Sequence, residues 1–326
     1  MSSDEKGWQI RMREEQFRFQ SNDNHTQIHG VKWIPDGEVK AVVQLVHGMA
    51  EHIDRYRTFA QYLNEYGILV VGHDHLGHGG SAASEADYGY FAEENGNQIL
   101  VRDIHRVFQL TKKEYGNVPY ILLGHSMGSF LARQYICCYG TELDGAVISG
   151  TAMQPEWLLK VALGLCKIEA KIFGWRYRSK LFQYMVAGSS NAAFKPNRTS
   201  CDWLCRDEAV VDAYVEDARC GFPFTLNGFY NLFLTLYKII RKEYLERMPR
   251  DLPVLFIAGE KDPVGNCGKG VAEVAELFEQ TGMRNVECKI YPGARHEVLN
   301  ELNKEEVFGD VLAWMEKNQL VNRMEN

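Results

Sequence analysis

The sequence predicts an α/β protein in which helices cover both faces of a mostly parallel sheet. Short, almost continuous apolar runs alternate with segments of helical periodicity, and this alternation is typical of a doubly wound sheet. The composition agrees, since 45% of the 326 residues are hydrophobic and 24% are charged, as in globular proteins with a large core. A chain of this length exceeds the usual size of a single core, which indicates a second domain or a large insertion.

The apolar runs predict the strands of the sheet, at residues 41–47, 67–75, 118–126, 144–150, 253–262 and 286–293. Helices are expected between and after them, at residues 53–65, 96–115, 127–139, 268–281 and 304–318. Residues 17–35 precede this series and consist of two strand-like runs around a polar turn. They predict an antiparallel edge of the sheet.

The alternation stops between residues 151 and 247, where the sequence is helical and rich in aromatic residues. Without this segment the chain would have the size of an ordinary single α/β domain. We therefore expect residues 1–150 and 248–326 to form the core domain. Residues 151–247 are then a helical cap, inserted where loops at the carboxyl ends of strands cover a site.

Charge and segment lengths exclude several classes of protein. The net charge is −7, so a nucleic-acid partner is not expected. Residues 1–17 contain no apolar run of the length that a signal peptide or a membrane span requires, and the other apolar runs are as short as strands. We expect a cytoplasmic protein, and in so long a chain we expect the eight cysteines to be free thiols.

The sequence contains a serine between two glycines in the segment Gly124-His125-Ser126-Met127-Gly128. The turn follows a predicted strand and opens a predicted helix, which is the context of a nucleophile elbow. Such a turn exposes the serine hydroxyl above the sheet, and its glycines permit a strained backbone and close helix packing. The sequence therefore predicts that Ser126 is a nucleophile.

A serine hydroxyl must lose its proton to a base that an acid orients, so a histidine and a carboxylate are expected downstream. Asp262 follows one predicted strand and His296 follows the next, and the order Ser, Asp, His is the one found with this elbow. We predict Asp262 as the acid and His296 as the base. A loop-capping role is the alternative for Asp262, a surface position is the alternative for His296, and Glu260 is the competing acid.

The anion formed by attack on a carbonyl needs two backbone N–H donors. Met127 follows the predicted nucleophile and supplies one of them. Met49 lies in a turn with His47 and Gly48 at the end of an earlier predicted strand, and we predict its N–H as the second donor. An unremarkable turn is the alternative for this segment.

Two groups of residues raise the question of a metal. The first is the histidine-rich cluster His52, His73, Asp74, His75 and His78. Histidines spaced in this way along a strand and a loop do not direct their side chains toward one ion, as the histidines of a helical metal motif do. The second is the pair Cys201 and Cys205, which lacks a second pair of matching spacing. We expect no metal and no other cofactor, and we expect Asp74 to stabilise its glycine-rich loop through backbone hydrogen bonds.

The motifs HGMAEH, HDHLGHGGS, GHSMGS, GEKDP and GARHEVLNE together resemble the monoacylglycerol lipase and lysophospholipase-like family of α/β hydrolases, which is grouped with serine aminopeptidase relatives. The resemblance extends from about residue 25 to residue 318. It implies an α/β-hydrolase fold with a cap, Ser126 as nucleophile, His296 as base and Asp262 as acid. It also implies an oxyanion hole formed by the N–H groups of Met49 and Met127.

The expected activity is hydrolysis of carboxylic esters with medium- or long-chain acyl groups, such as a monoacylglycerol or a lysophospholipid, through an acyl-enzyme. The expected partner is thus a small-molecule ester. An amidase or peptidase and a small-ester esterase are alternatives on the same residues. A non-catalytic binding protein and a haloperoxidase-like or lyase activity are alternatives of other classes.

Two segments of the predicted cap bear on the substrate. Phe229, Phe233 and Leu236 share one face of a predicted helix, and we expect this face to line an acyl pocket, with a purely structural role as the alternative. An amphipathic segment, interrupted by Lys160 and Lys167, consists of Trp157, Leu158, Val161, Ala162 and Leu165. Transient contact of this segment with a lipid surface is a further hypothesis. The sequence leaves the oligomeric state open.

Overall fold

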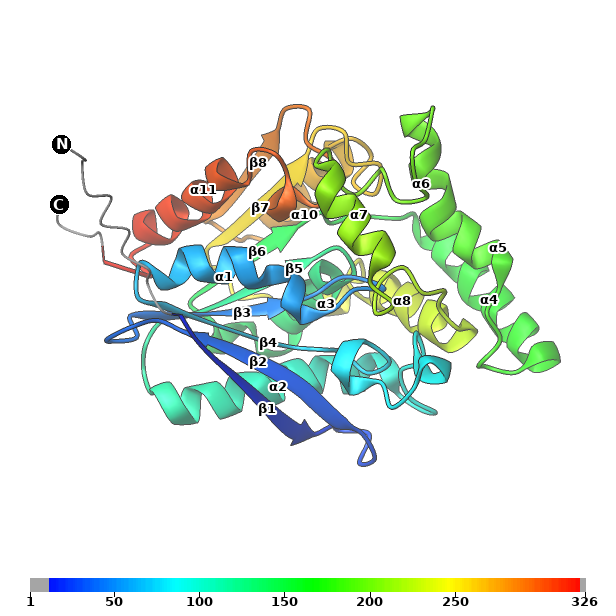
Figure 1. The fold of residues 1–326 in the computed structure, drawn as a ribbon, viewed down its shortest axis with the longest axis horizontal. Coiled ribbons are helices and arrows are strands. Elements are labelled where there is room, and N and C mark those ends of the chain that lie inside the picture. The colour runs from blue at the N-terminus through cyan, green and yellow to red at the C-terminus, as the bar shows by residue number, and fades with distance from the viewer. Residues whose placement is uncertain (1–11, 323–326) are drawn as a thin grey trace, which may run out of the picture.

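An eight-stranded sheet organises the computed structural model, which describes residues 12–322 (Figure 1). Residues 1–11 lie outside the described residues, and the expectation that residues 1–17 contain no signal peptide falls largely on them. No described helix combines the length and the apolar character that crossing a lipid bilayer requires.

The strands follow the predicted series. They are β1 (Arg13–Gln20), β2 (Gln27–Ile34), β3 (Ala41–Val46), β4 (Ile68–His73), β5 (Tyr120–His125), β6 (Gly145–Ser149), β7 (Val254–Gly259) and β8 (Val286–Tyr291). Their order in the sheet is β1-β2-β4-β3-β5-β6-β7-β8. The β1–β2 and β2–β4 pairs are antiparallel and all other pairs are parallel, which confirms the predicted antiparallel edge.

Helices cover both faces of the sheet, as the almost continuous apolar strands predict. They are α1 (Arg57–Asn64), α2 (Gly96–Tyr115), α3 (Met127–Tyr139), α10 (Lys269–Gln280) and α11 (Lys304–Lys317). Helices α1 and α11 pack on one face, while α2, α3 and α10 pack on the other. Side chains alternate between the two faces along each strand. Val43 packs in the layer with α1 and α11, and Val42 packs in the layer with α2, α3 and α10. The predicted fold class is confirmed.

The chain between β6 and β7, residues 150–253, is called the cap segment below. It contains α4 (Glu156–Phe173), α5 (Lys180–Gln183), α6 (Ser189–Asn191), α7 (Glu208–Glu216), α8 (Leu226–Lys238) and α9 (Lys242–Leu245). Figure 1 shows α4, α5, α6 and α8 beyond the carboxyl ends of the parallel strands. The predicted division into core and cap domains, with bounds at residues 150 and 248, stays a prediction.

Helix α8 joins the cap segment to the core through buried polar contacts. Its first turn is capped by the hydroxyl of Thr225, which accepts the N–H of Gly228. The Asn227 side chain accepts the N–H of Phe91 and donates to the carbonyl of Ala92. These bonds tie the start of α8 to the loop before α2 and hold the cap segment over the end of the sheet.

Candidate active site

The turn between β5 and α3 places Ser126 in a strained backbone conformation. Its φ is 53° and its ψ is −122°, in a region that residues with a side chain rarely adopt. A Cβ on Gly124 would lie 2.4 Å from the carbonyl oxygen of Gly128, and a Cβ on Gly128 would lie 1.9 Å from that of Val46. Both glycines are therefore needed for α3 to approach β3 and β5 closely enough to form this turn.

His296 and Asp262 meet although they lie on loops that follow different strands. His296 Nδ1 is 2.9 Å from Asp262 Oδ2, and both side chains are almost fully buried. A carboxylate can only accept, so Nδ1 carries the donated hydrogen and Nε2 is left as the acceptor. Among residues 12–322, no hydrogen-bond partner reaches this buried Nε2.

The competing acid, Glu260, lies elsewhere. Its side chain is half exposed and accepts the backbone N–H of Gly293 at 2.9 Å instead of contacting His296. The geometry thus pairs the histidine with Asp262.

The charge of Asp262 controls the protonation of His296. Burial acts to lower the pKa of His296, but the Asp262 carboxylate and its hydrogen bond outweigh burial and raise that pKa above its usual value. The next residue, Glu297, is also buried, yet the Arg55 guanidinium lowers its pKa to about 2. A raised pKa is suitable for a group that takes up a proton during a reaction.

The loop after β3 presents an N–H group without a partner. The N–H of Gly48 donates to Glu51 Oε1 at 2.5 Å, and that of Ala50 donates to His78 Nε2 at 3.2 Å. Between them, the N–H of Met49 has no acceptor within the described part of the chain. A Cβ on Gly48 would lie 3.1 Å from that of Ser126, so this loop passes directly beside the serine.

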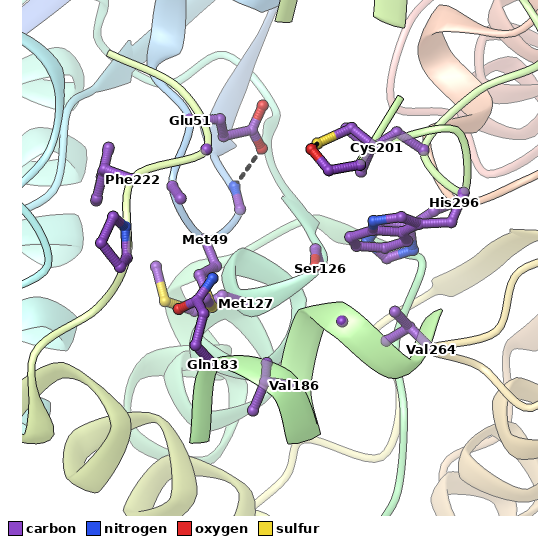
Figure 2. Close-up of a pocket in the computed structure, with 18 of the residues that line it drawn as sticks. Met49, Glu51, Ser126, Met127, Gln183, Val186, Cys201, Phe222, Val264 and His296 are labelled. Atoms are coloured by element: carbon purple, nitrogen blue, oxygen red, sulfur yellow. Dashed lines mark hydrogen bonds between the residues drawn. The ribbon is translucent and has the colours of Figure 1, made fainter. Parts of the chain in front are cut away.

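The second predicted donor is Met127, the first residue of α3. The first N–H groups of a helix have no intrahelical acceptor, so this N–H is available to a ligand. Figure 2 shows Met49 and Met127 next to Ser126 in the same cavity.

A cavity of about 690 Å³ opens above Ser126, within the usual range of small-molecule sites. Ser126, His296, Met49 and Met127 all line it (Figure 2). Most of the remaining wall is apolar and includes Phe130, Val186, Trp203, Leu204, Tyr214, Phe222, Leu232 and Val264.

The structure corrects the predicted acyl-pocket face of α8. Phe229, Phe233 and Leu236 do not line this cavity, whereas Leu232 does. The rings of Phe229 and Phe233 pack against Phe182 of α5, with centroids 5.7 and 5.6 Å apart. Helix α8 is apolar on two faces, and its own periodicity does not determine which face the neighbouring cap helices cover.

Sequence reasoning missed a buried charge network beside the site. Arg55 Nη1 contacts Glu51 Oε2 at 2.7 Å, and its two terminal nitrogens contact Glu297 at 2.7 and 2.6 Å. Glu51 also accepts hydrogen bonds from Gly48 and from the hydroxyl of Tyr56. The only local signal is the spacing of Glu51 and Arg55 by four residues, because Glu297 is distant in sequence.

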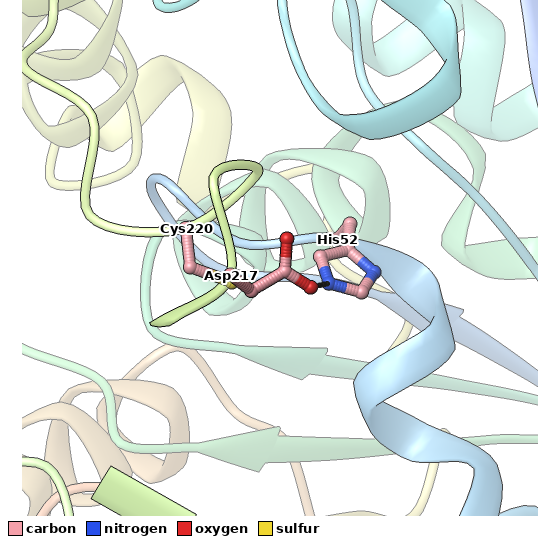
Figure 3. Close-up of side chains that lie close together, drawn as sticks. All are labelled: His52, Asp217 and Cys220. Atoms are coloured by element: carbon pink, nitrogen blue, oxygen red, sulfur yellow. Dashed lines mark hydrogen bonds and ion pairs between the residues drawn. The ribbon is translucent and has the colours of Figure 1, made fainter. Parts of the chain in front are cut away.

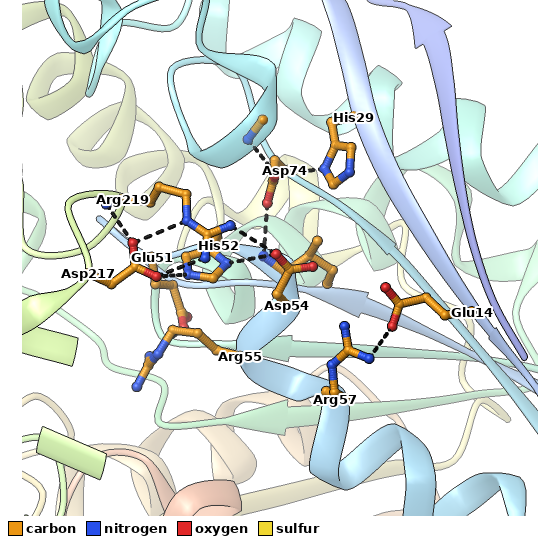
Figure 4. A network of polar contacts seen from close by, with 12 residues as sticks. Glu14, His29, Glu51, His52, Asp54, Arg55, Arg57, Asp74, Asp217 and Arg219 are labelled. Atoms are coloured by element: carbon orange, nitrogen blue, oxygen red, sulfur yellow. Dashed lines mark hydrogen bonds and ion pairs between the residues drawn. The ribbon is translucent and has the colours of Figure 1, made fainter. Parts of the chain in front are cut away.

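The histidine-rich loop has the structural role expected of it. Asp74 Oδ1 accepts the N–H of Ile53, and Oδ2 accepts the N–H of Gly80 and contacts His29 Nδ1 (Figure 4). Burial lowers the pKa values of His73 and His78 to about 4 each, which keeps these rings uncharged at neutral pH.

One group of side chains has the composition of a metal site. His52, Asp217 and Cys220 approach one another, with His52 Nε2 3.0 Å from Asp217 Oδ2 (Figure 3). Arg219 contacts Asp217 at 2.8 Å and Asp54 at 2.9 Å, and Figure 4 shows it between these two carboxylates. Asp217, the one carboxylate of this cluster, already pairs with the Arg219 guanidinium, and we assign no metal to the cluster.

The strand order, the elbow and the cavity at the carboxyl ends of the strands define an α/β hydrolase. The family model described as serine aminopeptidase, S33, matches residues 37–303, and the chain belongs to this family.

Relatives of this chain include lipases and an esterase. A monoacylglycerol lipase of Mycolicibacterium smegmatis is 28% identical over 284 residues, which span 87% of this chain and 90% of the relative. A monoglyceride lipase of Rattus norvegicus is 28% identical over 274 residues, spanning 83% and 80%. The crystal structure of a thermostable carboxyl esterase from Bacillus coagulans in complex with glycerol superposes with a TM-score of 0.88 at 28% identity, and the superposition covers 95% of this chain and 100% of that one.

Proposed function

We propose that this protein is a serine hydrolase that cleaves carboxylic esters of medium- or long-chain acyl groups, such as monoacylglycerols. One observation carries the proposal. The unpartnered Nε2 of His296, oriented by buried Asp262, borders the same cavity as the strained Ser126. The names of the relatives support an ester as the substrate.

The reaction begins when His296 Nε2 takes the proton of the Ser126 hydroxyl while the serine oxygen attacks the ester carbonyl carbon. Negative charge moves to the carbonyl oxygen, and the N–H groups of Met49 and Met127 stabilise it. Asp262 keeps the imidazole in the tautomer that accepts at Nε2 and stabilises its protonated form.

The tetrahedral intermediate then collapses. The bond between the carbonyl carbon and the alcohol oxygen breaks, and His296 gives its proton to the departing alcohol. The acyl group remains on Ser126 as an ester. A water molecule, deprotonated by His296, attacks this ester in the same way and releases the free acid.

The cavity wall supports an acyl chain as the larger substrate group. Apolar side chains such as Phe130, Leu204 and Leu232 surround the space above the serine. Each methylene that they shield from water contributes about 0.8 kcal/mol. A small-ester esterase would gain nothing from this wall, and the lipase names of the relatives do not favour an amidase or peptidase.

Contact with a lipid surface is part of the proposal, and the exposed side of α4 supports it. Trp157, Val161, Leu165, Ile168 and Ile172 recur at helical spacing and are between 39% and 67% exposed. Ala162, which the sequence grouped with them, is buried instead. An exposed apolar stripe on the cap segment is suited to contact with a lipid surface. The expected cytoplasmic location stays a prediction.

Labelling with a fluorophosphonate tests the nucleophile. The unaltered protein should form a covalent adduct, and Ser126→Ala should lose both the adduct and ester hydrolysis. Ser200→Ala is the matched control, because Ser200 lines the same cavity but lies outside the elbow. Equal labelling of the Ser126→Ala variant would refute the proposal, and faster cleavage of aminoacyl nitroanilides than of p-nitrophenyl esters would favour the amidase alternative.

A further inference from the structure

Strand β8 forms one edge of the sheet, and within residues 12–322 only β7 pairs with it. The carbonyl oxygens of Asn285 and Tyr291 accept hydrogen bonds from the β7 side. The N–H and C=O groups of one residue in a strand point to the same side, and the side alternates along the strand. The backbone groups of Val286, Cys288 and Ile290 therefore point away from β7, toward the open edge.

The side chains along this edge have a two-fold pattern centred on Cys288. Glu287 and Lys289 lie one residue to either side of it, and Val286 and Ile290 lie two residues to either side. In an antiparallel pair of two such strands with Cys288 opposite itself, Glu287 of each copy lies opposite Lys289 of the other. Val286 likewise lies opposite Ile290. Opposite charges and apolar residues are the favourable partners at such positions.

We propose that two copies of this chain associate through β8, antiparallel about a two-fold axis at Cys288, so that the two sheets become continuous. The outward backbone groups of Val286, Cys288 and Ile290 then bond to those of the second copy. In this register Glu287 and Lys289 occupy non-hydrogen-bonded positions, where opposing side chains lie closest.

Helix α11 repeats the charge pattern above the strand. Within one chain, Lys317 pairs with Glu287 at 2.9 Å, while Lys289 contacts both Asp310 and Glu306. Lys317 at the end of α11 thus lies level with Glu287, and the acidic part of α11, at Glu306 and Asp310, lies level with Lys289. The two-fold axis that places Glu287 opposite Lys289 also places Lys317 opposite the acidic part of the second α11.

This alternation identifies a second copy as the partner. A different protein would have to reproduce the same sequence of charges on a strand and on a helix, whereas a second copy supplies it by symmetry. A groove of about 370 Å³ lies at the same edge, between β8 and α11, with Leu255 and Trp314 in its wall. Leu255 and Trp314 are almost fully buried, so the groove is formed mainly by the charged side chains of β8 and α11.

Sedimentation equilibrium or light scattering of the full chain tests the proposal, and the expected mass is that of two chains. Cys288→Pro removes an outward N–H without removing a bond to β7, as proline is tolerated on an open edge. This variant should be monomeric with an unchanged circular dichroism spectrum, and Cys288→Ser should remain dimeric. A monomeric unaltered protein, or a dimeric Cys288→Pro variant, would overturn the proposal.

Charge exchange tests the register. Glu287→Lys and Lys289→Glu each place like charges opposite one another twice per dimer, and each should weaken Kd about tenfold or more. The double variant restores opposite charges and should recover dimerisation. Glu246→Lys is the control, because it makes the same change in an exposed pair with Lys242 in the cap segment. Failure of the double variant to recover, or equal weakening by the control, would contradict the register.

Discussion

Arg55 binds both carboxylate oxygens of Glu297, at 2.7 and 2.6 Å, and so connects the loop after β3 to the loop that carries His296. The side chains are 11% and 4% exposed. Glu51, on the same loop as Met49, shares the guanidinium. The two halves of the proposed catalytic machinery, the oxyanion loop and the histidine loop, are thus held together by one cation.

Arg55→Met should destabilise the protein by about 3–5 kcal/mol, because it leaves two buried carboxylates without their cation. Arg57→Met is the control. Arg57 pairs with Glu14 on the other side of the same turn (Figure 4), but its side chain is 47% exposed, so its loss should cost at most about 1 kcal/mol. Urea denaturation followed by circular dichroism measures the free energy of unfolding of both variants. Equal losses of this free energy would show that the buried network contributes no more to stability than the exposed pair.

The pH dependence of kcat/KM should report His296. The base must be neutral to accept the Ser126 proton, and Asp262 raises the pKa of His296 above its usual value of 6.5. Activity should therefore rise with pH and reach half of its maximum above pH 6.5. A midpoint clearly below 6.5 would exclude His296 as the titrating base.

Asp262→Asn should lower kcat by about 10⁴, because the amide stabilises the wrong imidazole tautomer and removes the charge that supports imidazolium. Glu260→Gln should leave kcat nearly unchanged, since Glu260 contacts Gly293 and not His296. Steady-state kinetics on one ester compares the two variants. A larger loss of kcat in Glu260→Gln than in Asp262→Asn would identify Glu260 as the acid.

Acid should destabilise the fold before the surface carboxylates are protonated. Burial lowers the pKa values of His73 and His78 to about 4, whereas an unfolded histidine titrates near 6.5. Between these values the unfolded chain binds more protons, so the free energy of unfolding falls as pH decreases from 6.5 to 4. One such histidine accounts for about 3 kcal/mol over this window.

His73→Leu tests this explanation directly. Both ring nitrogens of His73 are buried without a hydrogen-bond partner among the described residues, so leucine removes a titrating group and breaks no bond. The slope of unfolding free energy against pH should become shallower in this variant. His25→Gln, at an exposed position, should retain the full slope. An unchanged slope in His73→Leu would assign the acid sensitivity to other groups.

Chain-length preference should depend on Leu232 and not on Phe229. If the cavity holds the acyl chain, kcat/KM should increase up to about fourfold per methylene until the cavity is full. Leu232→Ala should reduce this increase because Leu232 lines the cavity. Phe229→Ala should cost about 3–5 kcal/mol of stability and leave the increase unchanged, since Phe229 packs inside the cap segment. Higher activity on acetyl than on octanoyl esters would contradict a lipid-like substrate.

Much of the fold could be predicted because its signals are local. A strand buried on both faces is apolar at nearly every position, as in β3, β5 and β7. The elbow requires glycines because a Cβ at Gly124 or Gly128 would overlap neighbouring backbone atoms. The helix bounds follow from the same apolar periodicity. None of this depends on distant parts of the chain.

The pairing of distant residues could not be predicted in the same way. Asp262 and Glu260 are two residues apart and chemically alike, and only the path of the loop after β7 decides which one meets His296. The same holds for Leu232 and Phe229, whose neighbours on α5 determine which of them reaches the cavity.

The sequence by itself determined the strands, the helices, the elbow at Ser126 and the chain order of serine, aspartate and histidine, because these follow from local backbone geometry and from periodicity. Only the tertiary structure decided that Arg55 binds Glu297, 242 residues away, and that no other strand within residues 12–322 pairs with the Cys288 edge. Buried charges and strand edges contact residues that are distant in sequence. No periodicity or motif in the sequence specifies which distant loops the fold brings together.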